Sequence, residues 1–188
     1  MKQSKTISTK KIVLVALLAA LTCAGSFLRI KVPSVVGTSA FHLGNILCAL
    51  SGILLGPWWG ALAAGLGSAI YDMLDPYYIS ECWLTFLMKG AYGLATGFVI
   101  RCGSKHWGYG KATVSAVAGA LTYAVLYLLK TFFYSGMLMH GLTADAAWVT
   151  VLEKLPATTF NAVIAIIGAP LLAIALRKAL AKSHLSID

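Results

Sequence analysis

The sequence predicts an all-α integral membrane protein with six transmembrane helices and with cytoplasmic N- and C-termini. Of its 188 residues, 59% are hydrophobic and only 11% are charged, and the mean hydropathy is +0.82. Soluble domains carry about 25% charged residues, so this chain has too few polar side chains to cover a water-exposed surface. We expect residues 1–188 to form one transmembrane domain, with cytoplasmic tails at 1–9 and about 177–188.

Six apolar runs, separated by polar or glycine- and proline-containing loops, predict the spans. They cover about 10–29, 41–55, 61–73, 82–100, 112–133 and 155–176. Lys10 and Lys11 lead into the apolar residues of the first run, a pattern that signal peptides share, but we expect this run to be kept as the first helix. Pro33 and Gly37 break the loop that follows it. GPWWG, before the third run, predicts a tight turn whose tryptophans suit the membrane interface.

Three further loops separate the later spans. The polar and aromatic sequence DPYYISE precedes the fourth run, and the basic, glycine-rich sequence RCGSKHWGYGK precedes the fifth. We expect a long connection at 135–153 before the sixth run.

The basic residues indicate the orientation of the chain. With the N-terminus inside, four of them precede the first span, three lie in the 101–111 loop, and three follow the last span. The first external loop holds only Arg29 and Lys31, so the positive-inside rule places both termini in the cytoplasm. Acidic residues gather on the opposite, external side: Asp72, Asp75, Glu81, Asp145 and Glu153.

Several function classes are disfavoured by the sequence. The net charge of +9 lies between and beyond the apolar runs, which is typical of contact with anionic lipid headgroups rather than nucleic acid. The four cysteines have no disulfide or metal spacing, and we expect no cofactor or metal. Gly110-Lys111 lacks the glycine spacing of a P-loop, so we do not expect this chain to hydrolyse ATP by itself.

Polar residues within the spans are candidates for a binding site, because a charge at mid-depth costs roughly 2.5–3.5 kcal/mol on insertion scales. Lys89 lies seven residues into the fourth span. It is either a substrate ligand or a partner of Asp72, unless its stem reaches the interface. Tyr123, Tyr127, Lys130 and Tyr134 follow the spacing of one helical stripe, which is either a ligand wall or helix packing.

The other candidates lie near the external ends of the helices. His42 and Asn45 open the second span three residues apart and therefore share a face. Aromatic rings beside carboxylates follow the third span and suit a polar heteroaromatic ligand, although an interfacial belt would look the same. Asn161, within the last span, needs a partner in the ligand or in a neighbouring helix. The predicted substrate-binding residues are His42, Asn45, Asp72, Tyr77, Tyr78, Glu81, Lys89, Tyr127, Lys130 and Asn161.

Small residues at four-residue spacing permit close approach of helices. Ala16 and Ala20 have this spacing on the first helix, and glycines repeat it from Gly52 to Gly60. The pattern favours either internal packing or docking to another membrane subunit.

The motif series resembles a known family. ALLAAL after a basic N-terminus, then FHLGNILCALSGILLGPWWGALAAGLGSAIYDML and TFLMKGAYGLATG, are similar to the S components of energy-coupling factor (ECF) transporters, in the riboflavin-transporter-like subgroup. The resemblance covers most of the chain through about Arg101. It implies a six-helix, non-enzymatic subunit in a bacterial plasma membrane. Such a subunit binds a vitamin externally and pairs with a transmembrane coupling subunit and two ATPase subunits.

The resemblance also assigns roles to residues. It implies that Ala16 and Ala20 dock to the coupling subunit, and that the loop at 31–40 acts as a lid. Relatives often have an acid where this chain has Asn45, which puts an acid-dependent substrate contact there in doubt.

We therefore expect a vitamin-capturing S component whose ligand is a B-type vitamin or precursor. A pyridoxine-like ligand is slightly preferred over riboflavin, cobalamin or a queuosine precursor. The alternatives are a self-sufficient carrier or channel, and a membrane enzyme acting on lipid. The enzyme would use His42 or His140 with Asp72 or Asp145 as an acid/base pair.

Overall fold

A computed structural model describes residues 9–34, 38–103 and 107–182. In chain order, the elements are α1 (Thr9–Phe27), β1 (Arg29–Pro33), β2 (Thr38–His42), α2 (Gly44–Leu55), α3 (Pro57–Leu74), the 3₁₀ turn η1 (Ile79–Glu81), α4 (Cys82–Arg101), α5 (Tyr109–Leu129), the π-helix η2 (Lys130–Met139) and α6 (Ala144–Lys182). Residues 1–8 and 183–188 of the expected tails lie outside the described residues. So do Lys105 and positions 35–37 of the expected lid. The C-terminal tail expected from about 177 is wrong in part, because α6 continues through Arg177 and Lys178 to Lys182.

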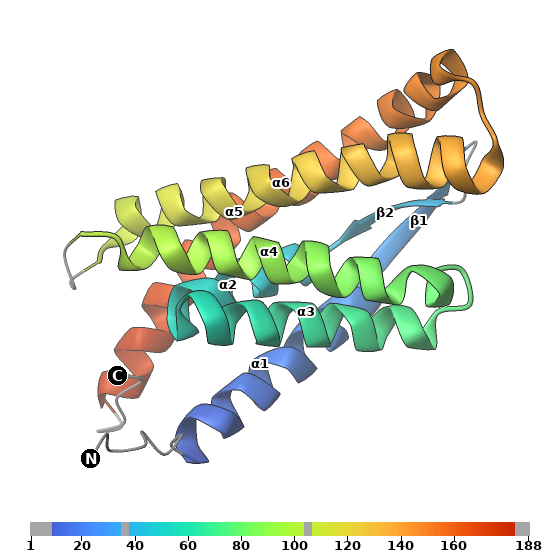
Figure 1. Cartoon of the computed structure of the whole chain (residues 1–188). Coiled ribbons are helices and arrows are strands. Elements are labelled where there is room, and N and C mark those ends of the chain that lie inside the picture. The colour runs from blue at the N-terminus through green and yellow to red at the C-terminus, as the bar shows by residue number, and fades with distance from the viewer. Residues whose placement is uncertain (1–8, 35–37, 104–106, 183–188) are drawn as a thin grey trace, which may run out of the picture.

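The helices form a bundle whose two ends differ in character (Figure 1). The start of α1, the end of α6 and the connection from α4 to α5 lie at one end. The β-hairpin, the α3–α4 loop and the α5–α6 loop lie at the other, which we call the hairpin end. Arg101, at the end of α4, and Lys111, in the first turn of α5, therefore lie opposite the hairpin, as do the basic residues at the end of α6.

Helices that are long and apolar enough to cross a membrane account for four parts of the described chain: Thr9–Phe27, Ile79–Arg101, Tyr109–Met139 and Ala144–Leu180. α2 has 12 residues and rises only about 18 Å at 1.5 Å per residue, so it is too short to cross alone. α3 has 18 residues. The helical membrane architecture is confirmed, whereas the crossing of all six helices and the side on which the termini lie stay predictions.

The prediction of a loop at 29–40 is wrong in part, because the described residues of this segment form an antiparallel hairpin. Arg29 pairs with His42 and Pro33 pairs with Thr38. Strand β2 also occupies Phe41 and His42, so α2 begins only at Gly44. The spacing of His42 and Asn45 predicted that they share a helical face. They do not, because His42 belongs to β2 and Asn45 to α2.

The long connection expected at 135–153 is also wrong. The π-helix continues α5 to Met139, and Gly141, at φ 61°, turns the chain before α6 begins at Ala144. α6 is 39 residues long and carries Pro156 and Pro170 within it. Proline is tolerated inside a membrane helix when neighbouring groups satisfy the freed carbonyls, so Pro156 does not mark the start of the span.

Close helix packing at glycines holds the centre of the bundle. A Cβ atom added to Gly60 would lie 2.6 Å from the Cα of Gly52, and one added to Gly93 would lie 2.6 Å from the carbonyl oxygen of Gly60. α2, α3 and α4 therefore approach almost backbone to backbone. The small-residue spacing from Gly52 to Gly60 serves internal packing.

Candidate functional site

A cavity of about 280 Å³ lies among the helices at the hairpin end. Side chains from α3, the α3–α4 loop, α4, α5, η2 and α6 line it, together with both strands of the hairpin and the end of α1. Nine of the ten predicted substrate-binding residues lie in its wall: His42, Asp72, Tyr77, Tyr78, Glu81, Lys89, Tyr127, Lys130 and Asn161. Their spans are far apart in the sequence, so the fold brings together residues that the sequence could only nominate singly.

Lys89 is the most deeply buried charge of the wall, with 4% of its surface exposed. Its ammonium donates a hydrogen bond to the side-chain oxygen of Asn45 and lies 3.8 Å from the centre of the Tyr123 ring. Asn45, the tenth predicted residue, lies behind Lys89 and is 2% exposed. It positions the lysine instead of lining the cavity.

Stacked tyrosines form one side of the cavity. The rings of Tyr92 and Tyr123 lie 5.8 Å apart, those of Tyr123 and Tyr127 lie 5.7 Å apart, and both pairs are nearly parallel. Tyr123 and Tyr127 line the cavity. A flat wall of this kind suits the face of an aromatic ligand.

His42 enters the cavity from β2 as a neutral imidazole. Burial, and then the positive charges of Lys89 and Arg29, lower the pKa of His42 well below its usual value. Its Nδ1 accepts a hydrogen bond from the Gly44 amide at 3.2 Å. The proton of the neutral ring is therefore on Nε2, which is a donor available to a ligand.

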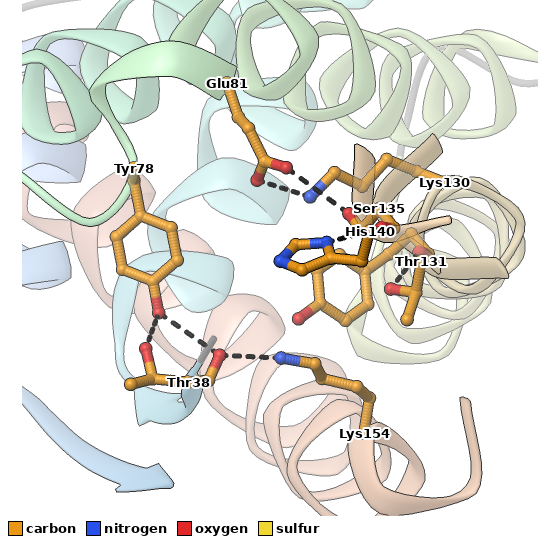
Figure 2. A network of polar contacts seen from close by, with 9 residues as sticks. Thr38, Tyr78, Glu81, Lys130, Thr131, Ser135, His140 and Lys154 are labelled. Carbon is orange, nitrogen blue, oxygen red and sulfur yellow. Dashed lines mark hydrogen bonds and ion pairs between the residues drawn. The ribbon is translucent and has the colours of Figure 1, made fainter. Parts of the chain in front are cut away.

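The outer part of the cavity is a polar network (Figure 2). Lys130 pairs with Glu81, and the hydroxyl of Ser135 donates to the same carboxylate at 3.3 Å. Across the cavity, Lys154 donates to the carbonyl oxygen of Thr38 at 2.8 Å. The hydroxyl of Thr38 lies 2.6 Å from that of Tyr78. Residues of the hairpin, the α3–α4 loop, η2 and α6 thus meet around one space.

The π-helix explains which residues of η2 face the cavity. Lys130 and Ser135 of η2 and His140, which directly follows η2, line it at intervals of five residues, the spacing that π-helical hydrogen bonds join. On an α-helix, residues five apart would point in different directions. The α-helical stripe predicted from Tyr123 onward therefore fails at Tyr134, whose ring packs against Trp83 at 6.2 Å between centroids.

Two sets of contacts hold the hairpin against the helices. Lys31 pairs with Asp75 at 2.6 Å, and Asp75 also accepts from the Tyr71 hydroxyl at 2.9 Å. Burial raises the pKa of Asp75, but hydrogen bonds from Lys31, Tyr71 and the Tyr77 amide outweigh it and hold the pKa below its usual value. On the other side, Asn161 of α6 hydrogen-bonds the backbone of β2. The hairpin covers the cavity between these two attachments.

Several polar wall residues were missed as site candidates by the sequence reasoning. Arg29 was treated as a loop charge, and His140 was nominated only for the alternative of a lipid enzyme. Lys154 precedes the last run expected at 155–176, and no pattern indicated that α6 begins ten residues before it. Ala16 and Ala20, the predicted docking residues, lie exposed on α1, away from the wall.

Within the described residues, no three His, Cys, Asp or Glu side chains are grouped as a metal ion would require. The arrangement is instead a polar, aromatic cavity with both signs of charge, suited to enclosing a small organic molecule.

Comparisons with known proteins agree with this arrangement. A family model described as "ECF-type riboflavin transporter, S component" matches residues 6–178. A curated protein from Pyrococcus woesei, described as an uncharacterized protein in gap 3'region, is 29% identical over 117 residues. That alignment covers 62% of this chain and 74% of the Pyrococcus protein.

Proposed function

Because this chain belongs to the family of ECF-type riboflavin transporter S components, we propose that its cavity captures a B-type vitamin or vitamin precursor for uptake. Membership makes the chain a substrate-binding component of a membrane transporter and not an enzyme. The single observation that supports the proposal most directly is the convergence of Lys89, Asp72 and Tyr127 on one cavity.

The size and the wall of the cavity favour a compact heteroaromatic ligand. A volume of about 280 Å³ is at the lower end of ligand pockets, which run from roughly 300 to 1,000 Å³. The stacked face of Tyr123 and Tyr127 suits a single flat ring, with hydrogen bonds from the neighbouring polar groups. A pyridoxine-like ring remains our first candidate, ahead of riboflavin and a queuosine precursor, and a corrinoid such as cobalamin is the poorest match to this volume.

The direction of transport follows from the ends of the bundle. The basic residues at the end opposite the hairpin favour a cytoplasmic location for that end. The cavity then opens to the outside of a bacterial plasma membrane. We propose that a transmembrane coupling subunit and two ATPase subunits supply the energy for release inward, and that the coupling subunit docks on the exposed face of Ala16 and Ala20.

The decisive experiment is to identify the small molecule that the protein carries. The chain is purified in a mild detergent, extracted, and analysed by mass spectrometry, and a vitamin panel is then tested for its effect on the melting temperature. We expect one vitamin-like compound to co-purify and to raise the melting temperature. If only lipid is recovered and no panel member changes the melting temperature, the proposal is wrong.

A matched pair of variants ties the ligand to the cavity. Tyr127→Leu removes a ring from the wall, whereas Tyr109→Leu removes an exposed ring at the opposite end of α5. We expect only Tyr127→Leu to weaken binding, by about tenfold, since a stacked ring contributes roughly 0.5–1.5 kcal/mol beyond its buried area. Equal binding by both variants would place the ligand elsewhere. Transport by liposomes that hold this chain alone would favour a self-sufficient carrier.

A further inference from the structure

The charges in the cavity wall are not balanced. Four cationic side chains line it, namely Arg29, Lys89, Lys130 and Lys154, and among the described residues only two carboxylates do so, namely Asp72 and Glu81. His42 adds no charge, because its imidazole is neutral. The wall itself therefore has more cationic than carboxylate side chains before a ligand binds, and Lys154 is compensated in part by Glu81 and by Glu153, which lies outside the wall.

Glu81 offers little compensation to the inner cations. It pairs with Lys130 and also accepts a hydrogen bond from Ser135. Its charge is therefore already matched by a lysine of η2. Asp72 is the remaining carboxylate of the wall.

Lys89 is buried with neutral partners. Its ammonium has three donors, of which one reaches the amide oxygen of Asn45, while the face of the Tyr123 ring lies beside it. No carboxylate of the described residues forms an ion pair with Lys89. Asp72 acts electrostatically on Lys89 but forms no ion pair with it. A buried ammonium without a directly paired carboxylate is costly, so an anion that enters and pairs with Lys89 stabilises the site.

Arg29 presents a second positive charge to the same region. Its Nε donates to the carbonyl oxygen of Ser26 at 2.7 Å, and its guanidinium stacks on the Tyr71 ring at 3.8 Å. These contacts orient the side chain but do not neutralise it, and no carboxylate of the described chain forms an ion pair with it. Arg29 and Lys89 both act electrostatically on Asp72 and on His42, so the two cations face the same carboxylate.

We propose that the captured ligand carries a negatively charged group, a carboxylate or a phosphate, and that this group binds between Lys89 and Arg29. The inference rests on the proposed function and specifies its substrate class. The ring of the ligand stacks on Tyr127 and Tyr123, and its acidic group completes the donors of the ammonium and the guanidinium. Both groups form strong, charge-assisted hydrogen bonds with carboxylate or phosphate oxygens.

The first test compares ligands that share one pyridine ring and differ in a single acidic group. Binding to the purified protein is measured for 4-pyridoxate against pyridoxine and for pyridoxal 5′-phosphate against pyridoxal, and the compound that co-purifies is examined for an ionised acid. We expect the acidic member of at least one pair to bind at least about tenfold more tightly. The pair that responds distinguishes a carboxylate from a phosphate.

The second test uses charge-removing variants. Lys89→Gln and Arg29→Gln should each weaken binding of the acidic compound at least about tenfold, and should weaken binding of its neutral partner much less. Lys10→Gln removes the same charge from the exposed start of α1 and should change neither. Lys89 is buried, and the Lys89→Gln variant could fail to fold. In that case the Arg29→Gln variant still decides the test.

The outcomes separate this inference from the proposed function. A neutral co-purifying vitamin, or neutral members that bind as tightly as acidic ones, overturns the inference and leaves vitamin capture standing. If no vitamin-like compound co-purifies and neither member of any pair binds, both proposals are wrong.

Discussion

The side-chain oxygen of Asn161 accepts a hydrogen bond from the backbone amide of His42 at 2.9 Å. The amide group of the same side chain donates to the carbonyl oxygen of Ala40 at 2.8 Å. One buried side chain of α6 thus occupies both a donor and an acceptor on the edge of β2, as a third strand would. The hairpin is fixed to the helix that contributes Lys154 to the cavity.

Replacing Asn161 by Ala should loosen the hairpin. The variant leaves two backbone groups of β2 without partners, which costs about 1–3 kcal/mol for each buried group that stays unsatisfied. We expect a lower melting temperature in detergent and faster ligand dissociation. Thr159→Ala, at an exposed position of α6, is the control and should match the unmodified protein. Identical melting of both variants would show that the Asn161 contacts do not hold the hairpin.

The neutral state of His42 predicts a pH dependence of stability. Its folded-state pKa lies well below the ordinary value of 6.5, so the unfolded chain binds the proton more readily. This contribution to stability is present above pH 6.5 and is lost as the pH falls from there towards the folded pKa. The slope approaches about 1.4 kcal/mol per pH unit for one proton.

The measurement is the melting temperature between pH 7.5 and pH 5. We expect His42→Gln to flatten the profile, because the glutamine does not titrate. His140→Gln, which removes the other histidine of the cavity wall, should keep most of the slope. A steep profile that survives His42→Gln would assign the titration to another group.

If the coupling subunit docks on α1, variants of its exposed face should impair assembly of the complex without changing ligand binding. Ala16→Leu and Ala20→Leu enlarge an exposed face of α1 that lies outside the cavity wall, so ligand affinity should not change. The larger side chains should prevent close approach of a partner helix and reduce co-purification with the coupling subunit several-fold. Ala175→Leu makes the same change at an exposed position of α6 and should assemble normally. Full assembly of the α1 variants would move the docking surface elsewhere.

Packing of α1 on α3 depends on Gly67. A Cβ atom there would collide with the carbonyl oxygen of Ala19 and would lie 2.7 Å from the Cβ of Thr22. We expect Gly67→Ala to destabilise the protein by about 1–3 kcal/mol, as overpacking does. Gly110→Ala meets no atom within 4 Å at the start of α5 and should stabilise the helix by about 0.5–1 kcal/mol. Equal thermal stability of the two variants would contradict the close helix contact.

The sequence could predict those site residues that differ from what their neighbours in the chain lead one to expect. Lys89 was recognisable because a charge in an apolar run needs a reason, and Tyr127 because it shares a helical stripe with Lys130. Membrane helices are visible in composition for the same reason, since the bilayer excludes most polar side chains. These signals depend only on neighbours within a few turns.

The features that the sequence did not reveal depend on distant partners. The hairpin strands have five residues each and contain Pro33, so their pairing has no strong local pattern. Ser135, and His140 just after η2, face the cavity because η2 is a π-helix. No residue pattern that we applied distinguishes a π-helix from an α-helix. Asn45 was predicted as a substrate-binding residue, whereas its position behind Lys89 follows from a contact across 44 residues.

The π-helical hydrogen bonding of η2 offers a route by which the ligand specificity of the site could change. A π-turn holds one residue more than an α-turn, so deleting a single position between Lys130 and Ser135 would allow an ordinary α-helix to form there. Every later side chain of the segment would then rotate relative to Glu81 and α6. A one-residue change in length could thus exchange the donors offered to an incoming molecule, with the remaining walls of the cavity left as they are.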